Sequence, residues 1–557
     1  MNTYDAIVIG SGISGGWAAK ELTEKGLTTL MLERGPYYEH IKDYKTANLD
    51  PWDFVHRGKV TQQEKKDRPY IARTWGATEA VIDSWTKDVD CPYTEVKPFN
   101  WWRSYRLGGR SILWGRQSYR WSDHDFEANA KDGWAIDWPI RYKDIEPWYD
   151  HVERFAGVCG SKEGLAQLPD GQFLPPMEMN CVEKDVAARI KEHYKGRRNM
   201  IIGRCANLTA PIPGRTQCQF RNRCWEGCPF GGYFSTQSST LPAALATGKL
   251  TVRPYSIVMR LLYDKDKKRA TGVEVLDAET NKTYTFYSKI VFVNASALNS
   301  AWILMNSATD VWPGGLGSSS GELGHNIMDH HYNLGAAGVM EGYEDKYVYG
   351  RRANGIYIVR FANLFGDKRD YLRGFGYQGS ASREGWQRDV AEMSVGVGLK
   401  ESLSEPGQWT MGITGFGELL PYHDNKITLD KEKKDKWGLP VLSMDAEIKN
   451  NEKKMRKDMV AEGVAMLEAA GIKKVHSWDN GHPVGDGIHE MGSARMGRDP
   501  KTSVLNKHNQ VWDALNVFVT DGACMTSAAC QNPSLTYMAL TARAADFAVT
   551  ELKKGNI

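Results

Sequence analysis

At 557 residues the chain exceeds one comfortable hydrophobic core, which predicts two domains. Its 71 basic and 68 acidic residues nearly cancel to a formal charge of +3, which argues against nucleic acid as a main partner because phosphate binding needs a concentrated basic face. The 41% hydrophobic and 25% charged content is that of an ordinary soluble globular protein, and no apolar run approaches the roughly 20 residues that cross a bilayer.

The first predicted unit is a strand, a tight turn, a helix and a second strand. Residues 6–9 are apolar, a Gly-x-Gly-x-x-Gly turn follows at residues 10–15, and residues 17–25 are predicted to be helical. A second apolar run over residues 28–32 ends in Glu33, about twenty residues beyond the turn. This arrangement is typical of a dinucleotide site, where glycines let the backbone approach a pyrophosphate and the acid holds a ribose hydroxyl. The pattern does not decide between NAD and FAD. Because the strand begins almost at the first residue, we expect no signal peptide.

A second glycine-rich loop follows an irregular segment. Residues 36–97 are polar and aromatic with little period, and residues 105–116 then carry Gly108 and Gly109 just before Ser111. Paired glycines before a serine suit a loop whose backbone amides approach a ligand closely. An ordinary turn is the alternative that the spacing leaves open.

Three of the nine cysteines, Cys218, Cys224 and Cys228, fall within eleven residues. An iron–sulfur cluster with three cysteine-bound irons needs only these three, and the Cys-Pro that ends the run is typical of ferredoxin motifs. Zinc needs a fourth ligand, for which Cys205 is available. A disulfide leaves one thiol unpaired, and an unligated loop is the fourth reading. The other cysteines are scattered, which suggests reduced thiols in the core.

The middle of the chain predicts mainly β structure. A meander of short strands is predicted at residues 250–254, 258–263, 270–275 and 283–286. Residues 290–300 are interpreted as a buried strand, a small-residue turn and the start of a helix, and alternating patterns over residues 326–445 favour an antiparallel sheet. Helices are predicted over residues 134–157, 183–194 and 450–470, the last one ended by a glycine.

The C-terminal part combines a loop, a strand and a helix. His489 lies in a Gly-flanked loop, residues 516–522 form a strand that ends in Asp-Gly, and a helix begins at Asn532 and Pro533 and runs to about Lys553. Asn at the N-cap and Pro at the first helical position make a normal helix start, so these residues alone favour Asn532 as a cap. His489 alone is equally well interpreted as a structural histidine.

Together these blocks resemble the glucose–methanol–choline (GMC) family of FAD oxidoreductases. The matching blocks are the turn at residues 10–15 with Glu33, Gly108-Gly109-x-Ser111, residues 294–300, residues 324–330, His489 with Gly492-Ser493, Thr520-Asp521-Gly522 and Asn532-Pro533. The resemblance implies FAD rather than NAD. It also implies an α/β fold of two domains, a Rossmann-like FAD-binding domain and a substrate domain built on an antiparallel sheet with helices. The FAD-binding domain is expected at residues 1–40, 98–150, 206–325 and 482–557, including the cysteine motif at 216–232, and the substrate domain at 41–97, 151–205 and 326–481.

The resemblance assigns roles within the site. His489 stands where the family keeps its catalytic base, and Asn532 where it keeps a second His or Asn. A neutral imidazole suits removal of a hydroxyl proton while hydride leaves for flavin N5, and an amide can hold the same oxygen. The helix that starts at Pro533 would direct its positive end at the flavin. The implied FAD-binding residues are Gly10, Gly12, Ser14, Gly15, Glu33, Arg34, Gly108, Gly109, Ser111, Val258, Ala295, Asp521, Gly522, Asn532 and Pro533.

Within the family, Cys218-x5-Cys224-x3-Cys228 is similar to the 3Fe-4S motif of the sugar dehydrogenase flavoproteins, which include glucose, fructose, gluconate and glucoside 3-dehydrogenases. This implies a 3Fe-4S cluster on the three thiols and a sugar or glycoside substrate. The C3 hydroxyl of a glucoside is preferred because residues 103–120 most resemble that group. Electrons are expected to leave the flavin through this cluster and to reach a separate cytochrome c-type chain or a quinone. A small signal-bearing subunit would place the protein in the periplasm or at the membrane, and the cytoplasm is the alternative.

The sequence also departs from the family pattern. Some relatives attach FAD covalently to a His in the glycine loop, and Leu113 stands there, so we expect non-covalent FAD. Asn294 and Ser296 replace the more usual Ala-Gly of the family turn. Two rival functions remain: an oxidase that uses O2 and has structural cysteines, and a redox-neutral lyase that keeps FAD as structure.

Overall fold

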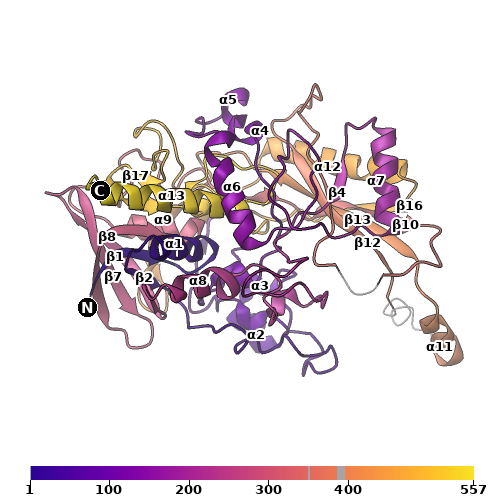
Figure 1. Cartoon of the computed structure of the whole chain (residues 1–557), viewed down its shortest axis with the longest axis horizontal. Coiled ribbons are helices and arrows are strands. Elements are labelled where there is room, and N and C mark those ends of the chain that lie inside the picture. The colour runs from indigo at the N-terminus through magenta and orange to yellow at the C-terminus, as the bar shows by residue number, and fades with distance from the viewer. Residues whose placement is uncertain (1, 349–351, 386–394) are drawn as a thin grey trace.

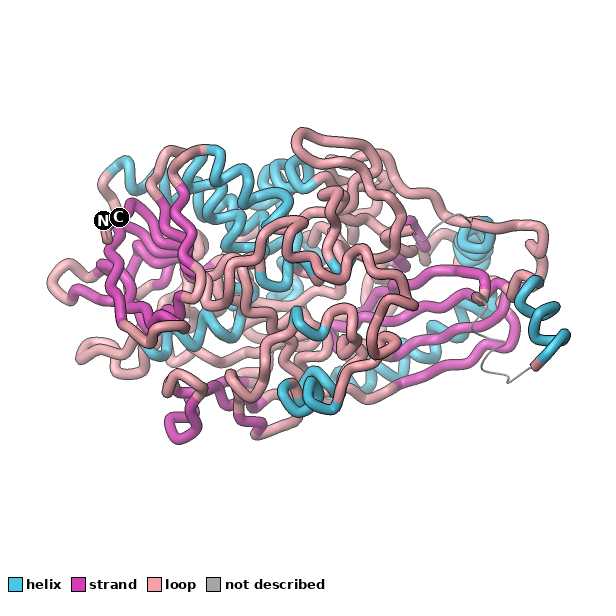
Figure 2. Tube along the Cα trace, turned by 90° about the horizontal axis from the view of Figure 1, so that it is seen from below, coloured by secondary structure: helices cyan, strands magenta, loops and turns pink. Residues whose placement is uncertain are grey.

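The structure, a computed structural model, describes residues 2–348, 352–385 and 395–557. Its helices and strands form a mixed α/β fold in which two large sheets lie toward opposite ends of the long axis, with loops filling much of the middle (Figures 1 and 2). Both termini lie at the end that carries β1 (Thr3–Ile9). This arrangement confirms the predicted fold class, whereas the residue ranges of the two domains stay a prediction.

The sheet near the termini has a parallel centre. Its strand order is β17 (Gln510–Val511), β18 (Ala514–Val519), β8 (Thr283–Val293), β1, β2 (Thr29–Leu32) and β5 (Leu250–Arg253). β1 pairs in parallel with β2 and with β8, and β8 pairs in parallel with β18. β6 (Ser256–Asp264) and β7 (Arg269–Asp277) extend it as an antiparallel hairpin beside β8. The inner strands are continuous apolar runs because helices cover the sheet and leave both faces buried.

Small side chains let two helices approach each other on this sheet. α1 (Ile13–Glu24) packs against α13 (Ser534–Lys554), and their contact belongs to a core that includes Ala18, Leu22, Ala544 and Ala548. α13 also contacts α6 (Tyr142–Ala156), and α1 contacts α8 (Leu241–Ala246). α9 (Ala297–Asn306) follows β8 and begins at the same sheet edge as α1. The N-termini of α1 and α9 therefore lie beside each other at the carboxyl ends of parallel strands.

The second large sheet is antiparallel. Its order is β16 (Lys473–Asp479), β10 (Leu334–Met340), β13 (Trp409–Glu418), β12 (Phe375–Arg383), β11 (Ile356–Ile358) and β4 (Met200–Ile202), with β9 (His330–His331) paired to β13. α12 (Asn450–Ala469) and α7 (Cys181–His193) pack on it, and Met455, Met459 and Met466 of α12 are buried in its core. A smaller sheet joins β14 (Lys426–Lys434), β15 (Pro440–Asp445) and β3 (Thr94–Glu95).

Several predicted element bounds were wrong for local reasons. The segments predicted as two strands at 283–286 and 290–293 are the single strand β8, because Tyr287 and Ser288 also pair with β1. α6 begins at Tyr142 rather than residue 134, since Pro139 disfavours helical backbone before it and the Asp144 carboxylate accepts the Arg141 amide. α1 begins at Ile13, inside the glycine turn, rather than at residue 17.

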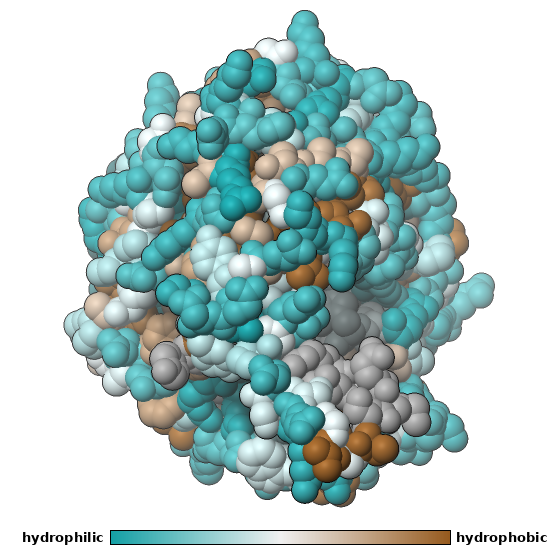
Figure 3. All heavy atoms as spheres, turned by 90° about the vertical axis from the view of Figure 1, so that its right-hand side faces the viewer, coloured by the Kyte–Doolittle hydropathy of each residue, from teal (hydrophilic) through white to brown (hydrophobic). Residues whose placement is uncertain are grey.

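The remaining helices are short and lie in connecting segments: α2 (Gln62–Asp67), α3 (Pro69–Ala72), α4 (Asp123–Phe126), α5 (Ala128–Asp132) and α11 (Gly396–Ser404). The end of the molecule that carries α11 is largely hydrophilic on its surface (Figure 3). Among the described residues, no helix is both long and apolar enough to span a membrane.

Candidate active site

Each glycine of the first turn has its own steric reason. Gly10 has φ +90°, and a Cβ there would lie 2.4 Å from the Asn294 carbonyl oxygen, so the end of β1 and the end of β8 approach each other only through glycine. A Cβ at Gly15 would lie 1.9 Å from the Gly10 carbonyl oxygen. A Cβ at Gly12 meets no described atom within 4 Å. Gly10 and Gly15 thus serve close packing, whereas Gly12 faces open space.

The N-terminus of α1 is free to bind an anion. Gly12 is its N-cap and supplies no side-chain hydrogen bond, and the buried Ser14 hydroxyl has no partner among the described residues. Nearby, the Glu33 carboxylate accepts hydrogen bonds from the Ser11 amide (3.2 Å), the Ser11 hydroxyl and the Gly35 amide (2.9 Å). Burial raises the pKa of Glu33, and these hydrogen bonds oppose the shift. The open space, the unpartnered hydroxyl and the uncapped helix fit a dinucleotide phosphate at α1.

The second glycine loop is tied to the first. Gly108 has φ +86°, and its amide donates to the Ser11 hydroxyl at 2.8 Å. The Ser111 hydroxyl donates to the Gly108 carbonyl at 2.6 Å and accepts from the Thr236 amide at 3.0 Å. Both glycine loops therefore face the same region.

The ends of β8 and β18 form a third segment beside the two glycine loops. The Asn294 side-chain amide donates to the Thr520 hydroxyl at 3.0 Å, and the Asp521 carboxylate accepts from the Ser300 hydroxyl at 2.6 Å and from the Ala523 amide at 2.9 Å. Burial raises the pKa of Asp521 to about 6. Ligands of open α/β sheets bind at this edge, beyond the carboxyl ends of the strands.

One cavity of about 360 Å³ runs from these loops to the C-terminal histidine. Of the residues implied by the resemblance, it is lined by Gly10, Gly12, Ser14, Glu33, Arg34, Gly109, Ser111, Val258, Ala295, Asp521, Gly522, His489 and Asn532. Three others do not line it: Gly15 packs inside the first turn, Gly108 packs against the Gln237 side chain, and Pro533 is the N-cap of α13. Leu113, where covalent relatives carry a His, also lines the cavity.

His489 and Asn532 meet at the far end of this cavity. The Asn532 amide nitrogen lies 3.2 Å from His489 Nε2, and the Asn532 oxygen accepts from the Gln378 side chain at 2.6 Å. Asn532 does not cap α13, whose N-cap is Pro533, so the interpretation of Asn532 as a cap was wrong. Its side chain instead contacts His489 and Gln378.

A second histidine, His330 of the family-matching block at residues 324–330, contacts His489. His330 Nδ1 lies 2.9 Å from His489 Nδ1, and the rings cross at 75°. Burial, together with His330 and Arg110, lowers the pKa of His489 well below its ordinary value, so its imidazole is neutral near pH 7. His330 and Gln378 come from the antiparallel sheet, far from His489 in the chain. His330 closes the family-matching block at residues 324–330 but was given no role, and no sequence signal marks Gln378.

A buried carboxylate holds the backbone around both histidines. Asp329 accepts hydrogen bonds from the amides of His330 (2.8 Å), Gly485 (2.8 Å), Gly487 (3.0 Å) and His489 (2.9 Å). Burial and the nearby Glu490 raise the pKa of Asp329 to about 7. The loop before His489 is therefore anchored on the residue that precedes His330.

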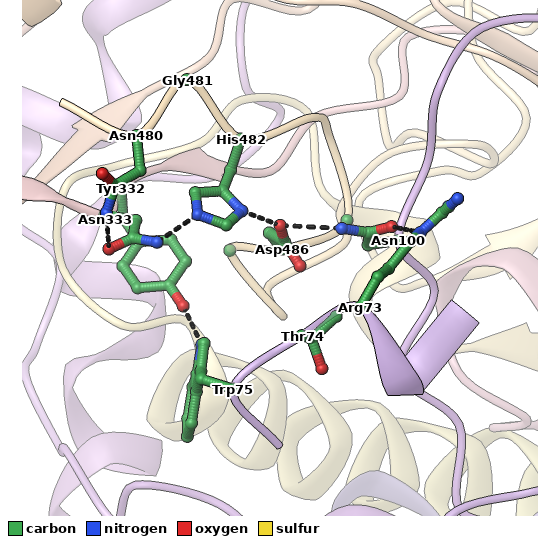
Figure 4. Close-up of polar contacts among 12 residues, drawn as sticks. Arg73, Thr74, Trp75, Asn100, Tyr332, Asn333, Asn480, Gly481, His482 and Asp486 are labelled. Atoms are coloured by element: carbon green, nitrogen blue, oxygen red, sulfur yellow. Dashed lines mark hydrogen bonds and ion pairs between the residues drawn. The ribbon is translucent and has the colours of Figure 1, made fainter. Parts of the chain in front are cut away.

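Aromatic side chains form one wall of the cavity beside His489. The Trp75 ring centroid lies 4.7 Å from that of Trp225 and 4.9 Å from that of Trp102, and all three line the cavity with Tyr332 and Phe416. Figure 4 shows the Trp75 indole directed at the Tyr332 hydroxyl, to which it donates. Trp225 lies in the cysteine loop, so that loop takes part in the wall.

Polar contacts behind this wall join segments that are distant in the chain. The His482 ring lies between the Asn333 side chain and Asp486 (Figure 4). Asp486 then accepts from Asn100 at 2.9 Å, and Asn100 accepts from Arg73 at 2.6 Å. Arg73 belongs to the segment that carries Trp75, so this network fixes the aromatic segment against the loop before His489.

The three clustered cysteines do not form the expected ligand group. Among the described residues, no set of three or more His, Cys, Asp or Glu side chains is arranged to hold a metal ion. Cys224 begins a short 3-10 turn, and Cys228 Sγ accepts from the Gly232 amide at 3.4 Å. Cys205, the possible fourth zinc ligand, lies instead with its sulfur 3.5 Å from Cys159 Sγ. All nine cysteines are free thiols, and Cys224, Cys228 and Cys205 lie near enough to Cys218 to add to the effect of burial in raising its pKa. This arrangement does not support the predicted 3Fe-4S cluster or zinc.

Comparisons with known proteins agree with this geometry. Two models described as GMC oxidoreductase match residues 4–332 and 421–541. A 2-methyl-1,2-propanediol dehydrogenase from Mycolicibacterium austroafricanum is 28% identical and covers 98% of this chain and 94% of its own length. A fructose dehydrogenase large subunit from Gluconobacter japonicus is 25% identical, with 99% and 98% covered. The structure of a pyridoxine 4-oxidase from Mesorbium loti has a TM-score of 0.60 at 15% identity and covers 98% of each chain.

Proposed function

This chain belongs to the GMC oxidoreductase family, and on that premise we propose that it is a dehydrogenase that oxidises a secondary hydroxyl of a sugar or glycoside. It is an FAD-dependent oxidoreductase that acts on CH–OH groups, as are its dehydrogenase relatives. One observation carries the finer proposal. His489 and Asn532 lie together at one end of the cavity whose other end is formed by the first glycine turn.

We place FAD along this cavity, where it supplies the acceptor for hydride. The residues that would hold its pyrophosphate are Gly10, Gly12 and Ser14 at the start of α1, and Glu33 would accept from the adenosine ribose. Leu113 has no nucleophile, so the cofactor is bound without a covalent bond. The uncapped N-terminus of α13, from which Ser534 and Tyr537 line the cavity, places positive potential there.

His489 acts as the base in this proposal. Its Nε2 faces Asn532 across the cavity end and takes the proton of the substrate hydroxyl while the C–H bond breaks. The Asn532 amide, held by Gln378, donates to the same oxygen and orients the C–H bond. Because the pKa of His489 is lowered by burial, the imidazole is unprotonated and ready to accept at neutral pH.

The aromatic wall supports a ring-shaped substrate. Trp75, Trp102 and Trp225 present flat apolar faces next to polar groups at His489 and Asn532, which suits a sugar ring with one hydroxyl at the reacting position. Among sugar positions we propose the C3 hydroxyl of a glucoside, from the resemblance of residues 103–120. Glucose, fructose and gluconate remain the competing substrates within the same group.

A decisive experiment is a screen of sugars and glycosides by anaerobic flavin reduction, followed by identification of the oxidised carbon. Bleaching by a glucoside with a 3-keto product supports the full proposal. Oxidation at another carbon would contradict the proposed C3 position but would support the proposed oxidation of a sugar hydroxyl. Absence of bleaching with every CH–OH compound, while FAD stays bound, would support the redox-neutral lyase.

The route of electrons out of the flavin is proposed without a cluster. Since the three thiols are not arranged as ligands, we assign no step to them. An external cytochrome or quinone is the proposed acceptor, and a small subunit that delivers the chain to the periplasm or membrane is proposed from the sugar dehydrogenase resemblance. Iron and acid-labile sulfide analysis tests this: about three iron atoms per chain would restore the cluster predicted from the cysteine spacing.

A second candidate is an oxidase that passes electrons to O2. In that case the three cysteines are structural, as the free thiols allow. The substrate found in the screen separates the candidates when turnover is followed with O2 alone and with a dye acceptor. Stoichiometric hydrogen peroxide would favour the oxidase, and dye-dependent turnover with slow O2 consumption would favour the dehydrogenase.

A further inference from the structure

A directed chain of hydrogen bonds passes through His489. It begins at the Gln378 side-chain nitrogen, which donates to the Asn532 oxygen, and the Asn532 nitrogen in turn faces His489 Nε2. On the other side of the ring, His489 Nδ1 lies 2.9 Å from His330 Nδ1, and His330 Nε2 contacts the Ala529 carbonyl oxygen. Each side chain in this series of hydrogen bonds has one donor and one acceptor available, and the Ala529 carbonyl at its end only accepts.

The carbonyl oxygen sets the direction of the whole chain. Because the Ala529 oxygen only accepts, His330 Nε2 carries a proton and donates to it. Burial lowers the pKa of His330 to about 4, so near pH 7 its imidazole is neutral and its Nδ1 holds a lone pair. The short contact between the two Nδ1 atoms then requires His489 Nδ1 to donate. His489 Nε2 is left without a proton, which agrees with its acceptance of the Asn532 amide.

We propose that His330 is a positioning residue that holds His489 in the tautomer with its proton on Nδ1, so that the Nε2 lone pair faces the substrate hydroxyl. The proposal rests on the proposed function, in which His489 is the base. A neutral imidazole in water samples both tautomers, and only the one with a free Nε2 can accept a proton on the cavity side. His330 thereby does with a neutral ring what a carboxylate does in other catalytic pairs.

The proton and electron balance of the step is simple. The substrate O–H bond breaks and an N–H bond forms at His489 Nε2, while the C–H bond breaks, the C=O bond forms and the electron pair leaves as hydride to oxidised flavin. The positive charge that develops on His489 is shared with the lone pair of His330 Nδ1 through the existing hydrogen bond. His330 keeps its own proton on Nε2, so no proton leaves the pair.

Neighbouring charged groups do not replace this contact. Asp329 accepts the backbone amides of both histidines rather than a ring nitrogen. Arg110 is paired with Glu490 at 2.7 Å, and its charge acts on His489 only by helping burial and His330 to lower the pKa of that ring. Among the described residues, the hydrogen bond recorded for His489 Nδ1 is the one to His330.

Two substitutions of equal shape separate positioning from packing. Asn carries its Oδ1 acceptor the same number of bonds from the backbone as His Nδ1, and Leu places a methyl group there. Both lose the contact with Ala529. With the substrate found in the screen, we expect His330→Leu to slow anaerobic flavin reduction by roughly 100-fold or more. His330→Asn should stay within about tenfold of the unsubstituted enzyme, since it keeps the acceptor. KM should change little in either variant, because neither removes a group that touches substrate.

Equal loss in the two variants, with FAD content and thermal stability matched, would overturn the proposal and leave His330 a packing residue. A loss confined to KM would also overturn it. A variant that fails to retain FAD is replaced in the test by nitrogen NMR of the unsubstituted holoenzyme labelled at histidine.

The NMR measurement is independent of any substrate. We expect the His489 signals, assigned by their loss in His489→Gln, to show a protonated Nδ1 and an unprotonated Nε2. The reverse tautomer would overturn the proposal even if the enzyme oxidises sugars as proposed. Conversely, the expected tautomer in a protein that reduces its flavin with no CH–OH compound would contradict the proposed function and not the histidine pair.

Discussion

The glycine turn at the start of the cavity allows a matched pair of substitutions with opposite consequences. A Cβ at Gly12 meets no described atom within 4 Å, and the residue lines the cavity. A Cβ at Gly15 would lie 1.9 Å from the Gly10 carbonyl oxygen, which is backbone and cannot move aside as a flexible side chain would. Gly12→Ala should therefore remove ligand space only, and Gly15→Ala should disturb the protein itself.

The size of each effect follows from these contacts. A methyl group at Gly12 keeps a phosphate away from the N-terminal amides of α1, and a hydrogen bond to a charged group contributes about 1.5–3 kcal/mol. Loss of one such bond weakens FAD binding roughly 10- to 100-fold. The forced contact at Gly15 resembles overpacking of a core and should cost about 1–3 kcal/mol of the free energy of unfolding, or more.

Fluorescence titration of FAD-stripped protein gives Kd, and urea unfolding of the same stripped protein gives its stability. We expect Gly12→Ala to raise Kd with unchanged unfolding, and Gly15→Ala to lower stability in the absence of FAD. An unchanged Kd in Gly12→Ala would show that the phosphates do not pass this glycine. Equal destabilisation of both stripped variants would refute the steric distinction.

Three further predictions concern the other end of the cavity. His489→Gln should slow anaerobic flavin reduction about 10²–10⁴-fold while FAD per chain, measured by absorbance, stays the same; an unchanged rate would remove His489 from the base role. Trp75→Leu should raise KM for a glycoside with little change in the maximal rate, because aromatic stacking contributes about 0.5–1.5 kcal/mol, and an equal KM increase for a small acyclic diol would argue against ring stacking. The depressed pKa of His330, about 4 in the folded protein, means that the unfolded chain binds a proton that the folded one does not. Stability is therefore lost as pH falls from about 6.5 toward 4. Urea unfolding at pH 7 and pH 5 should show roughly 2 kcal/mol less pH dependence in His330→Asn; identical pH dependence would mean that His330 is protonated when folded.

Local sequence signals predicted the secondary structure around the first glycine turn. The turn at residues 10–15 joins the end of β1 to the first residues of α1, and β2 and Glu33 follow in the order expected from the spacing. Such a unit is specified by residues close in the chain, because glycines, apolar runs and helix start signals act over a few positions. The loop at Gly108 and Gly109 was predictable for the same reason, because the paired glycines mark it locally.

The substrate end depends on contacts between distant segments. His330 and His489 are 159 positions apart, and Gln378 and Asn532 are 154 apart. No periodicity encodes such a pair, and His330 lies in a strand of two residues. Asn532 shows why local patterns are insufficient here. Asn before Pro predicts a helix cap, and the contacts of its side chain with other residues are visible only in the folded structure.

The cysteine loop shows why spacing alone is insufficient. Cys218, Cys224 and Cys228 are close in sequence, but metal binding requires their sulfurs to point at one centre. In this structure Cys228 instead accepts a hydrogen bond from a backbone amide, and Trp225 points to the cavity wall. The cysteine loop lies beside the active-site cavity. The sequence motif had predicted that this loop would carry electrons away from the flavin.

The position of β1 within its sheet fixes when the protein can acquire its cofactor during synthesis. β1 is made first, yet it lies between β2 and β8, and β8 in turn pairs with β18, which begins at Ala514. Contacts that bridge so much of the chain form slowly and only after the late segments exist. In a nascent chain the phosphate-binding turn therefore lies on a strand that has only one of its two partners, β2, until β8 is made. The cavity is complete only after β18 and α13 have left the ribosome, because Asp521, Asn532 and Ser534 line it.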